Sequence, residues 1–133
     1  MAQLSDADYR RLLAFRTELH GFLHWSEQAA GRAGLTPALH QLLLAVKGHP
    51  GDEAPSVADV ATALHMRHHS AVELAQRAEA AGLLTRERDA VDHRRMRLAL
   101  TALGETQLEA LTREHLPRIR ALASALEAVA EER

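Results

Sequence analysis

The 133-residue chain has no cysteine, few aromatic residues and no apolar run that approaches the length of a membrane helix. Without cysteine it has no disulfide, no thiolate metal ligand and no cysteine redox switch, so any metal would need histidine and carboxylate ligands. Aromatic residues make up 3% of the chain, and alanine and leucine dominate its 47% apolar share. This composition favours closely packed helices over a sheet-rich sandwich.

The N-terminus, MAQLSDADYRRLL, lacks the basic segment and apolar run of a targeting signal. A membrane helix needs about 20 apolar residues, which no part of the chain supplies. We therefore expect a cytoplasmic protein. Its length fits a single compact domain of mainly α structure, because a second domain would have no room for a core of its own.

Charge is distributed unevenly along the chain. The formal net charge is −2, yet residues 65–97 hold seven arginines and five acidic residues, a local charge of +2. The rest of the chain has nine basic and thirteen acidic residues, a charge of −4. Four of the nine histidines also lie in the positive stretch. A positive patch on an acidic body is compatible with orientated docking on DNA.

The first helix is predicted over about residues 6–30, because Ser5 and Asp8 have the spacing of a capping pair and apolar residues recur at helical period. Gly31 and Gly34 are predicted to end it, since glycine reaches positive φ at little cost. The apolar stripe of this helix is longer than one small core can cover. We therefore expect part of it to pair with a second copy of the chain.

The middle of the chain predicts a helix-turn-helix. A second helix over about 37–48 is followed by a loop rich in proline and glycine. Ser56 and Asp59 then form a capping pair for a third helix over about 57–64. After a tight turn, a fourth helix over about 68–81 carries apolar residues on one side and hydrogen-bonding residues on the other.

A β-hairpin is predicted directly after these helices. Residues 83–88 form a plausible strand, and residues 96–100 alternate between apolar and polar side chains as a half-buried strand does. The polar loop between them carries Arg94. A helix-turn-helix followed by a hairpin with arginine at its tip is a winged helix, in which the hairpin is the wing.

The C-terminal part predicts two more helices, the fifth capped by Thr101 and the sixth beginning after a break at Pro117. Their apolar stripes exceed what a small winged helix can cover. We expect them to pair with their equals and with the first helix across a two-fold axis. The chain is thus interpreted as one domain over 1–133, in which dimerisation helices at 1–34 and 102–133 flank a DNA-binding lobe at 35–101.

Three short motifs carry a family resemblance. They are Glu79-Ala80-Ala81-Gly82-Leu83-Leu84 at the end of the fourth helix, Asp92-x-Arg94 in the hairpin loop, and Leu100-Thr101-x-x-Gly104 after the second strand. With these motifs and this order of elements the chain resembles the MarR family of bacterial transcription regulators. The resemblance implies a homodimer on a palindromic operator, with the fourth helix in the major groove and the wing in the minor groove.

Ten residues are predicted to contact DNA, and they lie on the fourth helix and the wing: Arg67, His68, His69, Ser70, Glu73, Gln76, Arg77, Asp92, Arg94 and Arg95. Those at the helix start lie where free backbone N–H groups attract phosphate. Glu73 departs from the basic or hydroxyl residue that many relatives carry there, and its carboxylate suits a cytosine amino group. Arg94 suits a narrow minor groove, and Asp92 suits a bidentate pair that holds Arg94 extended.

The histidines raise a second possibility. His20 and His24 lie one helical turn apart, but two ligands do not make a metal site. His40 and His115 are candidates for further ligands, yet no spacing typical of a metal site appears, and we predict neither a metal nor a cofactor. His24, Trp25 and His40 are candidates instead for a small-molecule effector pocket between the first helix and the lobe, as the resemblance suggests. Trp25 also fits a place in the core.

No carboxylate pair, activated nucleophile or phosphate loop appears, so an enzyme is not expected. The predicted function is a sequence-specific DNA-binding regulator that binds promoter DNA as a homodimer. Repression is the main expectation and activation the less common one, and release by a small-molecule effector is left open. Two alternatives remain from the sequence. One is a helical module that uses the winged helix to bind protein, and the other is a regulator that responds to metal through its histidines.

Overall fold

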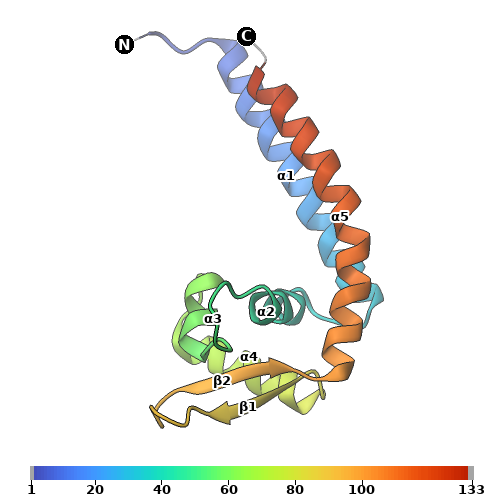
Figure 1. Ribbon diagram of the computed structural model, residues 1–133. Coiled ribbons are helices and arrows are strands. Elements are labelled where there is room, and N and C mark those ends of the chain that lie inside the picture. The colour runs from blue at the N-terminus through green and yellow to red at the C-terminus, as the bar shows by residue number, and fades with distance from the viewer. Residues whose placement is uncertain (1, 132–133) are drawn as a thin grey trace.

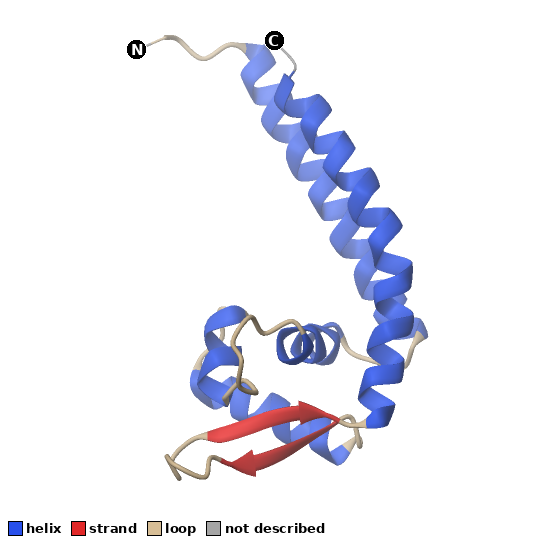
Figure 2. Cartoon of the chain, in the orientation of Figure 1, coloured by secondary structure: helices blue, strands red, loops and turns tan. Residues whose placement is uncertain are grey.

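The computed structural model describes residues 2–131. Two long helices, α1 (Asp6–Arg32) and α5 (Ala102–Glu131), lie side by side, with the start of α1 beside the end of α5 (Figure 1). A compact lobe lies at the opposite end of this pair, and Figure 2 shows that it contains both strands. Its elements are α2 (Pro37–Lys47), α3 (Val57–Ala63), α4 (His68–Ala80), β1 (Leu84–Arg88) and β2 (Met96–Leu100).

The predicted fold class, mainly α with a β-hairpin wing, is confirmed. The first four helices and both strands begin and end within two residues of their predicted positions. Capping explains this agreement at two helix starts, because Ser5 with Asp8 and Ser56 with Asp59 each form a complete capping box. None of the described helices has the length and hydropathy that crossing a membrane requires.

The predicted role of Gly31 at the end of the first helix is wrong. Gly31 lies within α1, which continues to Arg32. The chain turns at Gly34, whose φ of 79° lies in the left-handed region that glycine tolerates best. The N–H of Leu35 then donates to the carbonyl of Ala30 at 2.9 Å, which satisfies one of the last helix carbonyls.

The predicted break at Pro117 is also wrong, since α5 runs through Pro117 as one helix of 30 residues. Proline has no N–H, so the carbonyl four residues before it, that of Arg113, loses its helical partner. Arg113 and Pro117 are both exposed, so we expect water to satisfy that carbonyl. The helix accommodates the ring by bending in its middle (Figure 1).

The core lies inside the lobe and where the lobe meets α5. Its largest fully buried side chains come from α2, α3, α4, both strands and α5: Leu42, Leu43, Val60, Leu74, Leu84, Leu98 and Leu111. The two strands are antiparallel, with Leu84 opposite Leu100 and Arg88 opposite Met96. The segment before α3 adds an isolated bridge between Ser56 and Arg97, which ties the hairpin to the helix-turn-helix.

The Leu-Thr-x-x-Gly motif joins the lobe to α5. The Thr101 hydroxyl donates to the carbonyl of Gly82 at 2.6 Å and accepts the N–H of Gly104 at 3.1 Å, so it caps α5 as predicted. The N–H of Thr101 donates to the carbonyl of Leu83 at 3.0 Å. A side chain at Gly104 would overlap the carbonyl oxygen of Leu83, so only glycine permits this approach.

Replacing Gly104 by alanine should therefore destabilise the protein by about 1–3 kcal/mol, the usual cost of overpacking a buried contact. Gly21→Ala is the matched control, because a Cβ at that exposed position on α1 meets no atom within 4 Å. It should stabilise the protein by up to about 1 kcal/mol through helix propensity. Urea unfolding of both variants measures the two effects, and equal stabilities for them would contradict this account.

Candidate nucleic-acid interface

The turn between α3 and α4 determines how α4 is held. His65 adopts a φ of 53°, and the N–H of Met66 donates to the carbonyl of Ala61 at 2.9 Å, which closes α3 abruptly. The inner side of α4 is buried against the lobe through Ala71, Leu74, Ala75 and Ala78. Three of these residues are alanines, so α4 packs closely and its opposite side faces solvent.

The outer side of α4 carries the residues predicted from the sequence to contact DNA. All are exposed except Ser70, which is half-buried: Arg67, His68, His69, Ser70, Glu73, Gln76 and Arg77. His69 Nε2 lies 3.2 Å from Glu73 Oε1, one helical turn along. Arg67 occupies the N-cap without a side-chain capping bond, so the first N–H groups of α4 are not satisfied by that side chain.

At the wing tip Arg94 pairs with Asp92, the partner that the sequence predicted. Arg94 Nε donates to Asp92 Oδ1 at 3.1 Å, and its Nη2 donates to Asp92 Oδ2 at 3.5 Å. The hydrogen bond from the Arg94 side chain is the largest cause that lowers the pKa of Asp92. The Arg94 side chain is nevertheless 91% exposed, so its guanidinium is oriented and still accessible to a partner.

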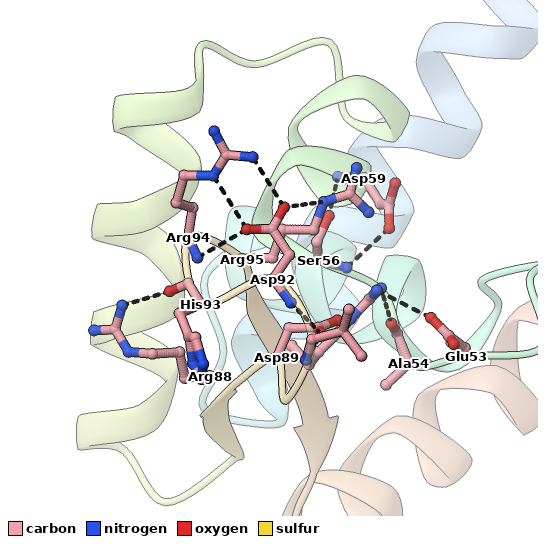
Figure 3. A network of polar contacts seen from close by, with 12 residues as sticks. Glu53, Ala54, Ser56, Asp59, Arg88, Asp89, Asp92, His93, Arg94 and Arg95 are labelled. Atoms are coloured by element: carbon pink, nitrogen blue, oxygen red, sulfur yellow. Dashed lines mark hydrogen bonds and ion pairs between the residues drawn. The ribbon is translucent and has the colours of Figure 1, made fainter.

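A second set of contacts at the wing has no counterpart in the predicted site (Figure 3). Arg97 Nε donates to Asp89 Oδ2 at 2.8 Å, and the Arg97 side chain is only 19% exposed. The N–H groups of Asp92 and Val91, followed by Arg97, lower the pKa of Asp89 to about 2. The pattern that would have revealed this pair is an acid and an arginine flanking the same hairpin loop.

Some arginines of the positive stretch therefore form ion pairs with acidic residues of the same chain. Arg86 Nη2 lies 3.0 Å from Glu79 Oε1, and Arg97 is enclosed by its own partners. Arg67, Arg77, Arg94 and Arg95, which were predicted to contact DNA, are exposed. A small hollow brings the two groups of predicted residues together, since His68 of α4 lines it with Arg94 and Arg95 of the wing.

A cavity of about 620 Å³ lies between α1, α2 and α5. Of the three predicted effector residues only His40 lines it. Trp25 is half-buried and packs beside the cavity wall, with its ring 4.7 Å from that of His115 and under the guanidinium of Arg118. His24 is exposed and lies outside the lining.

His115 is the cavity residue that the effector prediction missed. Its ring centroid lies 4.9 Å from that of His40, its Nε2 lies 2.7 Å from Ser26 Oγ, and its Nδ1 lies 2.7 Å from the Leu111 carbonyl. The carbonyl only accepts, so Nδ1 carries a proton. The spacing of Leu108, Leu111 and His115 showed a shared helix side, but nothing in the sequence placed it opposite His40. Among residues 2–131 no three histidine or carboxylate side chains gather as metal ligands.

The arrangement defines a winged-helix protein: a helix-turn-helix is followed by a β-hairpin, and long helices precede and follow the lobe. Residues 33–95 match the MarR family model, which spans the helix-turn-helix and the first half of the wing. This part of the chain is similar to the MarR family.

Solved structures extend the likeness to the long helices. AbsC, a MarR family transcriptional regulator from Streptomyces coelicolor, matches with a TM-score of 0.76 and 22% identity over 92% of this chain and 82% of AbsC. MepR, a transcription regulator of the Staphylococcus aureus multidrug efflux pump MepA, matches with a TM-score of 0.72 and 25% identity over 83% and 79% of the two chains. No match was found among curated protein sequences.

His40 in the cavity should make stability depend on pH. Burial lowers the pKa of His40 from 6.5, and repulsion from His115 lowers it further. Because the unfolded chain then binds a proton more readily than the folded one, stability should fall as the pH drops below about 6.5. His40→Gln removes this group, so its melting temperature should fall less than that of the wild type between about pH 7.5 and 5.5. If the melting temperatures of His40→Gln and the wild type fell equally over this pH range, His40 would not be the group responsible.

Proposed function

We propose that this protein is a transcription repressor that binds a palindromic operator as a homodimer. One observation carries the proposal: α4 presents an exposed polar face beside a wing whose Arg94 is paired with Asp92 yet remains 91% exposed. A guanidinium held in this way suits the narrow minor groove, because it enters DNA without first losing side-chain freedom. A mutant of Staphylococcus aureus MepR is bound to an oligodeoxyribonucleotide in a structure that matches this chain with 25% identity and a TM-score of 0.68.

The contacts divide by chemistry. Ser70, His69 and Gln76 suit base edges in the major groove, while Arg67 and Arg77 suit phosphates. His68 and Arg95 line the hollow between α4 and the wing, where a phosphate oxygen would meet two basic side chains. Glu73 lies close enough to His69 to orient it, and its carboxylate suits a cytosine amino group. We expect these residues to set the operator sequence.

The long helices support the homodimer. Large apolar residues of α1 remain exposed in the single chain, with Leu12 at 58%, Leu13 at 66% and Tyr9 at 60%. An apolar groove at the outer end of the pair is lined by residues of both α1 and α5, among them Phe15 and Leu126. A second copy related by two-fold symmetry would cover these surfaces and fix two recognition helices about 34 Å apart, one turn of DNA.

The cavity between α1, α2 and α5 is the proposed effector site. It lies where the long helices meet the lobe, so a bound molecule would change the angle between them and hence the spacing of two recognition helices. His40 would contact the effector directly, and Trp25 would act through His115. We propose no contact for His24. Since operator DNA is the proposed ligand, we place the protein in the cytoplasm.

Arg94→Ala should weaken binding to every DNA sequence by about tenfold or more, and should lower the salt dependence by about one counterion. Gln76→Ala should instead change the preferred sequence. Arg113→Ala, an exposed arginine on α5, controls for loss of charge and should bind normally. Fluorescence anisotropy on operators selected from random duplexes measures all three. If the DNA affinity of the wild-type protein did not depend on salt concentration, the alternative of a protein-binding module would be favoured.

Leu13→Asp should convert the dimer into monomers. Each buried leucine contributes about 1.5–3 kcal/mol, and the residue occurs twice in a two-fold dimer. Leu103→Asp is the control, since Leu103 is also exposed, at 48%, but lies at the lobe end of α5. Sedimentation equilibrium distinguishes the two species, and a wild-type protein that stays monomeric at micromolar concentration would rule the homodimer out.

A further inference from the structure

Arg97 joins three parts of the molecule through its guanidinium. Besides Asp89, it reaches the loop before α3, where Nη1 donates to the carbonyl of Ala54 at 2.9 Å and Nη2 pairs with Glu53 at 3.0 Å. In Figure 3 the acceptors Glu53 and Ala54 lie next to each other, on the same side of the view as Asp89. The guanidinium is therefore enclosed by acceptors, unlike that of Arg94, and is not positioned to bind phosphate.

Asp89 carries the connection onward to the wing tip. One of its carboxylate oxygens accepts the Arg97 bond, and the other accepts the N–H groups of Val91 at 2.8 Å and Asp92 at 3.0 Å. Its own N–H donates to the carbonyl of Arg95 at 2.8 Å, which closes the loop. Asp92, the residue that holds Arg94, is thus itself held by Asp89.

We infer that Arg97 is a positioning residue: through Asp89 it fixes the wing loop against the helix-turn-helix and so sets the direction in which Arg94 is presented. This inference rests on the proposed function, since it concerns how the same wing meets DNA. The loop over 89–95 lies at the end of a two-stranded hairpin, and most of its side chains are exposed. Its other bonds, such as that from Arg88 to the His93 carbonyl at 2.6 Å and that from the Arg95 N–H to the Asp92 carbonyl at 3.0 Å, stay within the hairpin and do not tie it to the segment before α3. Without the Arg97–Asp89 contact the loop would sample many conformations, and DNA binding would have to order it again.

The two acidic partners of Arg97 allow a test in which a charge effect and a positioning effect predict opposite changes in DNA affinity. Asp89→Asn and Glu53→Gln each remove one negative charge beside the same guanidinium. If only charge matters, both variants should bind DNA more tightly. If Arg97 acts through Asp89, Asp89→Asn should weaken binding about tenfold, while Glu53→Gln, whose side chain is 80% exposed, should not weaken it.

The Arg94→Ala background tests whether the effect passes through Arg94. In that background Asp89→Asn should cause no further loss of affinity, because the residue it positions is gone. Losses that add would mean that Asp89 and Arg97 act on DNA by another route and would overturn the inference. Thermal unfolding of each variant confirms that the lobe remains folded.

A measurement without DNA separates this inference from the proposed function. The chain has no cysteine, so Val91→Cys, at a position 93% exposed on the loop, accepts a single nitroxide label. The label spectrum should show a more mobile loop in Asp89→Asn and an unchanged loop in Glu53→Gln. An equally ordered loop in Asp89→Asn would overturn the inference even if DNA binding were normal. If the wild-type protein did not bind DNA, the proposed function would be overturned. The label mobility would still show whether Asp89 orders the wing loop.

Discussion

The close approach of α5 to the turn after α4 is the contact on which the rest of the structure depends. Thr101 bonds to the carbonyl of Gly82 and caps α5, and Gly104 lets the helix lie directly on Leu83. This contact converts the end of the wing into the start of a long helix without a flexible linker. The orientation of α4 and the wing is consequently coupled to the long helices, and a change at the cavity can be transmitted to the face proposed to meet DNA.

The electrostatics of the lobe depend on which arginines are paired and how. The chain is acidic overall but has an exposed basic surface, because some arginines form intramolecular ion pairs while the guanidinium groups of others remain exposed. Arg97 and Arg86 are paired with Asp89 and Glu79 and stabilise the hairpin, whereas Arg94 is paired through a short side chain that leaves its guanidinium exposed. The local excess of positive charge is therefore small, and orientation rather than total charge distinguishes the proposed interface.

Much of the fold was predictable because its signals are local. Capping boxes at Ser5 and Ser56, a proline at the first position of α2 and a glycine after α4 each determine a boundary within a few residues. The Asp92–Arg94 pair was predictable for the same reason, since its partners are two residues apart. Pro117 misled the prediction because the cost of proline in a helix depends on whether the freed carbonyl is accessible to water, which is a tertiary property.

The sequence by itself determined the first four helices, the hairpin, the polar face of α4 and the pairing of Arg94 with Asp92, because these features depend on residues close to one another in the chain. Only the tertiary structure decided that His115 faces His40 across a cavity, that His24 lies outside it, and that Arg97 reaches back to Glu53 and Ala54. These contacts join residues at least 43 positions apart. Periodicity assigns such residues to a side of a helix or strand, but the packing of the whole chain selects which side meets which.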